Sequence, residues 1–184
     1  MALLLIWTMS GCTPSVPPPS DVTPRVVSTI AMIDDLVAEV AGGVVQRDLL
    51  ITGELDPHSY ELVKGDDEKL DSAALIIANG LGLEHGVSLQ SRLEPSPTVC
   101  LIGAYVESHF PDRLIWKQGS IDPHIWMDVS LWAEAVDPIV EALARLLPHE
   151  AEGFAVRGER LKEHLLALHQ KIYTTLHTVP SPRR

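Results

Sequence analysis

Two histidines stand in the same short motif, and the chemistry of that motif indicates a shared metal site. The tripeptide Asp-Pro-His occurs at residues 56–58 and again at residues 122–124. In each copy, proline fixes its own φ and holds the preceding residue in an extended conformation, so the histidine follows a stiff corner. Neutral imidazole is the commonest protein ligand for transition metals. We therefore expect His58 and His124 to bind one metal ion.

Each motif also carries a carboxylate and an aromatic side chain at matching positions. Asp56 and Asp122 lie two residues before the histidines, where a carboxylate can accept a hydrogen bond from the imidazole and orient its ring. Tyr60 and Trp126 lie two residues after the histidines. A single Asp-Pro-His is an ordinary turn or helix-start sequence. Two copies with aromatic residues at the same offset favour a metal site.

The segments that must position these motifs alternate between short strands and helices. Strands are expected at residues 26–30, 44–51, 74–78 and 98–105. Helices are expected at residues 32–41, 66–74 and 87–93, the second of them capped by Asp66 or Asp67. This alternation predicts an α/β lobe with a mainly parallel sheet flanked by helices. Ligands bind such sheets beyond the carboxyl ends of the strands, where we expect His58 and His124 to meet.

From residue 129 onward the apolar spacing is helical throughout. Pro138 should kink or restart the first helix. A second apolar stripe, without proline, predicts a helix over residues 150–178 that reaches roughly 40 Å at 1.5 Å per residue. Four histidines accompany this helix and are expected to be solvated or packing residues: His149, His164, His169 and His177.

The N-terminal residues have the pattern of an exported lipoprotein. Residues 1–12 resemble a lipoprotein signal peptide that ends in the lipobox Met9-Ser10-Gly11-Cys12, although no Lys or Arg precedes the apolar run. We expect Cys12 to carry the lipid that anchors the protein to a membrane. Residues 13–24 are rich in proline and predict an extended tether.

Composition limits the classes of partner. The chain has 184 residues, of which 46% are hydrophobic, so it can bury a core. Its formal net charge of −11 argues against binding to nucleic acid and against adsorption to an anionic membrane surface. The two cysteines do not form a disulfide framework, and Cys100 lies in an apolar run typical of a small buried residue.

In combination, residues 56–61, the run Asn79-Gly80-Leu81-Gly82-Leu83-Glu84 and residues 122–128 resemble the metal-binding lipoproteins of zinc and manganese ABC importers, the cluster A-I or TroA-like solute-binding proteins. The resemblance covers about residues 25–180. It implies two α/β lobes joined by one long helix, with the metal in the cleft between them. Residues 25–147 would form the N-terminal metal-binding lobe, with His58 and His124 as its ligands, and residues 148–180 the connecting helix.

The same resemblance implies that the other two ligands belong to a second lobe. Residues 181–184 correspond to its truncated start, so the second lobe is expected to be missing. With two ligands, the chain is expected to bind metal weakly and to expose part of the long helix. His85 and His109 each follow a predicted strand and remain candidates for an additional ligand.

The function implied by the resemblance is that of a substrate-binding lipoprotein. It would capture zinc, manganese or iron outside the cytoplasmic membrane and deliver the ion to an ABC importer permease and its ATPase. A truncated, non-transporting remnant or a surface adhesin remains an alternative. A zinc hydrolase is disfavoured, because the sequence has no H-E-x-x-H motif and no evident general base beside either histidine. The sequence does not identify the metal.

Overall fold

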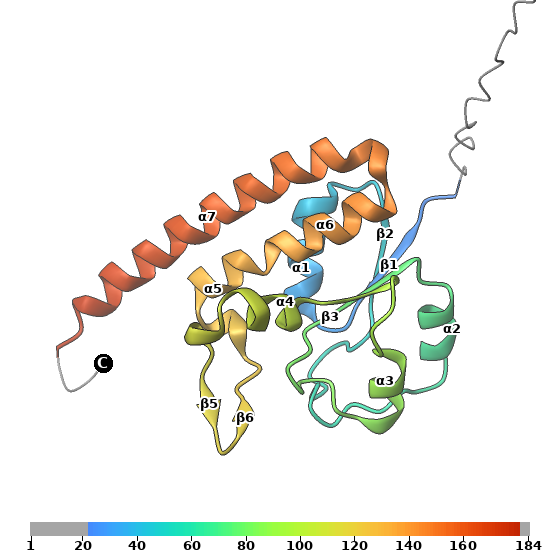
Figure 1. Cartoon of the computed structure of the whole chain (residues 1–184), viewed down its shortest axis with the longest axis horizontal. Coiled ribbons are helices and arrows are strands. Elements are labelled where there is room, and N and C mark those ends of the chain that lie inside the picture. The colour runs from blue at the N-terminus through green and yellow to red at the C-terminus, as the bar shows by residue number, and fades with distance from the viewer. Residues whose placement is uncertain (1–21, 181–184) are drawn as a thin grey trace, which may run out of the picture.

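The computed structural model describes residues 22–180, and a four-stranded parallel sheet forms the centre of this part of the chain (Figure 1). The strand order is β2-β1-β3-β4, with all three pairings parallel. The strands are β1 (Arg25–Ser28), β2 (Gln46–Leu49), β3 (Leu75–Ala78) and β4 (Val99–Leu101). The short strands β5 (Trp116–Lys117) and β6 (Ser120–Ile121) form a separate antiparallel hairpin. This arrangement confirms the predicted mainly parallel α/β fold.

Seven α-helices surround the sheet in the described part of the chain. They are α1 (Ala31–Ala41), α2 (Asp66–Asp71), α3 (Val87–Arg92), α4 (Ile102–His109), α5 (Val129–Glu134), α6 (Val136–Leu146) and α7 (Ala151–His177). Three short 3₁₀ turns lie at Pro111–Arg113, Ile125–Met127 and Pro148–Glu150. The lipobox, Cys12, most of the tether and residues 181–184 lie outside the described residues.

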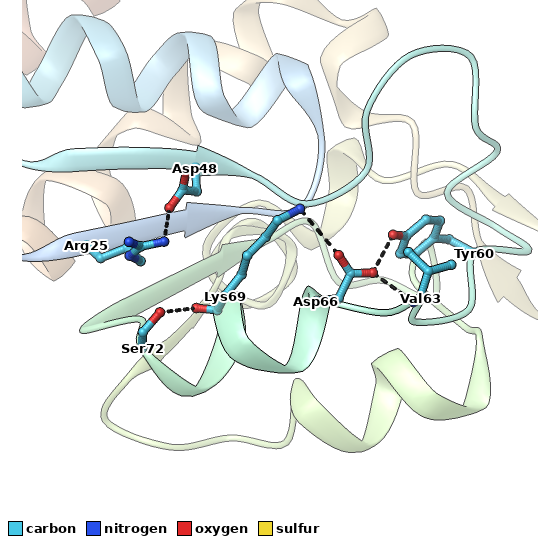
Figure 2. Close-up of polar contacts among 7 residues, drawn as sticks. All are labelled: Arg25, Asp48, Tyr60, Val63, Asp66, Lys69 and Ser72. Atoms are coloured by element: carbon cyan, nitrogen blue, oxygen red, sulfur yellow. Dashed lines mark hydrogen bonds and ion pairs between the residues drawn. The ribbon is translucent and has the colours of Figure 1, made fainter.

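The core lies between the sheet and the helices α1 and α6. All of β3 is buried, because both faces of this central strand are covered. α1 packs on β1 and β2, while α6 packs on β3 and β4. α2 and α3 lie on the other side of the sheet in Figure 1. An ion pair between Arg25 and Asp48, 2.6 Å apart, adds a link between β1 and β2 (Figure 2).

The long C-terminal helix α7 runs across α5, α6 and α1 (Figure 1). Its first half is anchored by Phe154, which is fully buried, and by Gly158, where an added Cβ would lie 2.4 Å from Val140. Its last turns extend past α5 in Figure 1, and several apolar residues in the second half of the helix are exposed: Leu166, Leu168, Ile172 and Leu176. Among residues 22–180, no helix is both long and apolar enough to cross a bilayer.

The last predicted strand is wrong beyond Leu101. We expected a strand over residues 98–105, but β4 ends opposite Ala78, the last residue of β3, and α4 begins at Ile102. The amide of Gly103 donates to the carbonyl oxygen of Asn79 at 2.8 Å, and a Cβ on Gly103 would lie 2.5 Å from that oxygen. An apolar run does not distinguish a buried strand from a buried helix, which explains the error.

Two smaller expectations concern helix starts. The residue that precedes α2 is Gly65, in a left-handed conformation with φ of 99°, so neither Asp66 nor Asp67 is the N-cap. Asp66 lies in the first turn of the helix and is buried. Pro138 does restart the helical segment as expected: α6 begins at Val136, and proline is tolerated in its first turn.

Candidate metal centre

His58 and His124 come together although 66 residues separate them. Their Nε2 atoms are 3.2 Å apart, and their ring centroids are 5.2 Å apart. Two nitrogens bound at ~2.1 Å to one tetrahedral ion would be about 3.4 Å apart. The two rings therefore meet at the spacing that a shared ion requires. That they bind metal stays a prediction.

The Asp122 carboxylate orients the ring of His124. Its Oδ1 lies 2.6 Å from His124 Nδ1 and also accepts from the His124 backbone N–H at 3.1 Å. Because an ionised carboxylate only accepts, Nδ1 carries the proton and Nε2 is left with its lone pair. The hydrogen bond from the His124 ring is also the main reason why the pKa of Asp122 is lowered. The Nε2 atom of His124, which lies 3.2 Å from that of His58, thus has a free lone pair.

The Asp56 carboxylate has a different role, contrary to the symmetry expected from the repeated motif. It accepts from the backbone N–H of His58 at 3.0 Å and from the Ser59 hydroxyl at 3.3 Å. These contacts shape the turn that carries His58 rather than orienting its ring. The two copies of the motif share a backbone geometry but not a ring-orienting carboxylate.

The loop that carries His58 is fastened to α2 by a buried carboxylate (Figure 2). Asp66 accepts from the Tyr60 hydroxyl at 2.6 Å, from the Val63 backbone N–H at 2.9 Å and from Lys69 Nζ at 3.3 Å. Burial acts to raise the pKa of Asp66, but these donors outweigh it and lower that pKa. Burial, with the hydrogen bond to Asp66, raises the pKa of Tyr60 to about 12.

The aromatic residue of the second motif packs beside its histidine. Trp126 lies edge-on to His124, with ring centroids 5.2 Å apart, and edge-on to Trp132 of α5. The Asp128 side chain caps α5 by accepting from the backbone N–H groups of Ser130 and Leu131. The segment after His124 is therefore held by a helix start on one side and an aromatic cluster on the other.

A buried network joins the carboxyl edge of the sheet to the second motif. Glu84 accepts from the Thr29 hydroxyl at 2.6 Å and from the backbone N–H groups of Asn79 and Gly80 at 2.8 and 2.9 Å. The Asn79 side chain donates to the Pro123 carbonyl oxygen at 3.0 Å. Sequence reasoning used this run only for its resemblance to a family. The signal for its role was an Asn-Gly turn directly after a buried strand.

The remaining candidate ligands lie in different surroundings. His109 ends α4 rather than following a strand, and its ring stacks on Tyr105 with centroids 4.0 Å apart. His85 lies near the pair, with its ring centroid 5.4 Å from that of His58. Burial raises the pKa of the Cys100 thiol to about 11, as expected for a small core residue. Within the described residues, no three His, Cys, Asp or Glu side chains are already arranged as a metal-holding group.

His124 lines two hollows, one of which is a pocket of about 370 Å³ along the β5–β6 hairpin, and a third hollow has no histidine in its lining. A pocket of about 230 Å³ is lined by His124 and Asp122 together with residues of the segment 113–115 and of the start of α5. A larger groove of about 600 Å³ lies between the Gly80–Glu84 turn and α3, and neither His58 nor His124 lines it. We centre the site on the histidines, because their two imidazole nitrogens lie close together there, whereas no histidine lines the larger groove.

Comparison with known proteins gives a consistent family match. The family described as "Zinc-uptake complex component A periplasmic" matches residues 26–184. The chain is 38% identical over 174 residues to the metal-binding protein YtgA of Chlamydia pneumoniae, covering 95% of this chain and 53% of that protein. It is 29% identical over 166 residues to the manganese-binding lipoprotein MntA of Bacillus subtilis, covering 89% of this chain and 54% of that protein.

The fold is also found among solved structures. The Fe(III)-bound structure of YtgA from Chlamydia trachomatis superimposes with a TM-score of 0.82 at 36% identity, covering 86% of this chain and 55% of that one. The chain thus spans about half the length of the curated relatives it matches. The shared part includes the parallel sheet, its flanking helices and the long helix α7.

Proposed function

This chain belongs to the zinc-uptake complex component A periplasmic family, and from that premise we propose that it binds a transition-metal ion for import. The ion, zinc, manganese or iron, is the cargo and is held by His58 and His124. The chain would act as the substrate-binding component of an ABC transporter rather than as an enzyme. In this proposal, residues 25–147 form the metal-binding lobe and residues 148–180 the connecting helix.

The observation that carries the proposal is the 3.2 Å separation between the Nε2 atoms of His58 and His124. The hydrogen bond from Nδ1 of His124 to Asp122 leaves Nε2 of His124 ready to donate a lone pair. Both rings are solvent-accessible, so an ion can enter and leave without opening the core. Such reversible access suits a carrier.

The partners and location follow from the family and from the sequence. We propose that the chain works outside the cytoplasmic membrane, anchored by lipid on Cys12, and delivers the ion to a permease and its ATPase. The name of the Bacillus subtilis relative as a manganese-binding lipoprotein supports this placement. The family description names zinc, and the chlamydial structure holds Fe(III), so all three metals remain candidates.

Zinc titration of the purified 184-residue chain, in competition with a chelating dye, tests the proposal. We expect one zinc ion per chain, and a loss of affinity of at least about tenfold in His58→Ala and in His124→Ala, since outer-shell changes alone cost 10–100-fold. His109→Ala is the matched control, because that exposed ring stacks on Tyr105 of its own helix. If both site variants bound zinc as tightly as the parent, the proposed site would be wrong.

A further inference from the structure

We propose that His85 is a third imidazole ligand of the ion held by His58 and His124. The inference rests on the proposed function and extends it, because it completes a three-nitrogen ligand set within this one lobe. His85 approaches from the turn between β3 and α3, an element that supplies neither of the two Asp-Pro-His motifs. Its ring centroid lies 5.4 Å from that of His58, close to the 5.2 Å between His58 and His124.

The first support is a close backbone contact that holds His85 beside the first motif. Gly86 packs so tightly on the segment after His58 that a Cβ at Gly86 would lie 1.9 Å from the carbonyl oxygen of Tyr60. Any residue other than glycine would force these two segments apart. The close approach therefore sets the separation of the two backbone segments that carry His85 and His58.

The second support is a carboxylate that ties the start of α3 to the same segment. Glu61 accepts from the backbone N–H groups of Val87 and Ser88 at 2.8 and 3.0 Å and from the Ser88 hydroxyl. The Ser88 hydroxyl in turn accepts from the Leu62 backbone N–H at 2.9 Å. The hydrogen bonds from Ser88 are the main reason why the pKa of Glu61 is lowered. These contacts join residues 61–62 to residues 87–88, directly after the contact between Tyr60 and Gly86.

The third support is the protonation of the His85 ring. Its Nδ1 lies 2.8 Å from the carbonyl oxygen of Gly82, which can only accept a hydrogen bond. Nδ1 therefore carries the proton, and Nε2 has a free lone pair. His124 is prepared in the same way by Asp122, so both rings offer Nε2 as the ligand atom.

Two of the three ring pairs have the spacing of a shared ion, but the three side chains are not yet arranged around one point, so the His85 side chain must turn to complete the set. Two imidazoles bound through nitrogens at ~2.1 Å to a tetrahedral ion have ring centroids about 5 Å apart. The two observed separations from His58 match this value. The His85 ring is exposed, so coordination can draw it toward the ion without disturbing the core.

A three-imidazole set has a chemical consequence. Three neutral nitrogens with one open position resemble the ligand set of an accessible zinc site. Such a set favours borderline metals such as zinc over magnesium and calcium, which prefer oxygen ligands. The lobe described here would therefore retain its ion with three of its own side chains.

The test combines zinc affinity with the absorption spectrum of the cobalt(II)-loaded 184-residue chain. The spectrum reports the number and type of ligands around the ion. We expect His85→Ala to weaken zinc binding by at least about tenfold and to change the cobalt(II) spectrum. His109→Ala should alter neither quantity. Thermal unfolding of the metal-free variants shows whether His85→Ala leaves the fold intact.

Each result separates this inference from the proposed function. If the parent binds zinc and His58→Ala does not, while His85→Ala matches the parent in affinity and spectrum, His85 is not a ligand and the proposed function stands. If His85→Ala lowers affinity with an unchanged cobalt(II) spectrum, the residue only positions the loop, and the inference is wrong. If the parent binds no zinc or cobalt, both proposals fail together.

Discussion

At the scale of single residues, the Asp122–His124 pair shows how a carboxylate orients an imidazole ring. The short hydrogen bond that Nδ1 of His124 donates to Asp122 selects the tautomer, and the carboxylate places negative charge behind the ring. Asp122 also accepts from the His124 backbone N–H, so one side chain sets both the ring and its loop. The pair is exposed enough to exchange an ion with solvent.

Asp122→Asn should therefore weaken zinc binding by about tenfold to hundredfold. Asparagine can still accept a hydrogen bond but lacks the charge that raises the basicity of the imidazole. Asp112→Asn removes one negative charge at an exposed position of the same lobe and serves as the control. Equal losses in the two variants would show that only net charge matters, and the proposed role of Asp122 would have to be abandoned.

At the scale of elements, the long loop between β2 and α2 has few regular hydrogen bonds of its own and depends on its anchors. Tyr60 is buried two residues after His58, and its hydroxyl donates to the buried Asp66 at the start of α2. The hydrogen bond links the turn that carries His58 to a helix. Loss of this bond should affect both stability and site geometry.

Tyr60→Phe should lower the free energy of unfolding by about 1.5–3 kcal/mol at neutral pH, since the lost hydrogen bond has a charged acceptor. Chemical denaturation measures this change. Tyr173→Phe, at an exposed position on α7, should have little effect. A Tyr60 variant as stable as the parent would mean that the bond to Asp66 contributes nothing.

The pH dependence of the Tyr60→Phe effect has a definite sign. The pKa of Asp66 is lower in the folded state than its ordinary value, so its ionised form stabilises the fold above that value. This contribution is lost as pH falls through the folded pKa. The stability difference between the parent and Tyr60→Phe should therefore be constant near neutrality and shrink below about pH 4. A difference that grows in acid would contradict this assignment.

At the scale of the whole molecule, the proposed lipid anchor on Cys12 would hold the lobe at a membrane surface. Expression of the 184-residue chain in a bacterial host, followed by detergent partitioning, tests this anchoring. The parent should enter the detergent phase, and Cys12→Ser should remain in the aqueous phase, because it cannot accept the lipid. Cys100→Ala removes the other, buried thiol and should partition like the parent. If Cys12→Ser partitioned like the parent, the proposed anchor would be excluded.

Much of the fold could be predicted because the sequence carries local signals for it. The apolar runs that became β1 and β3, the helical spacing of α1 and α7, and the glycine that ends α1 all act through neighbours in the chain. The repeated Asp-Pro-His motif acts in the same way, because proline constrains the adjacent backbone. These features identified the α/β class and the two central histidines without coordinates.

Other features depend on residues far apart in sequence, and only the tertiary structure decided them. The end of β4 at Leu101 is set by the length of its neighbour β3 and by the contact of Gly103 with Asn79. The approach of His58 to His124 requires the sheet order and the network of Glu84 to place two distant loops together. Spacing along the chain determines local backbone geometry, whereas contacts between distant loops depend on tertiary packing. The position of His85 beside His58 is such a contact, so it could not be read from the sequence.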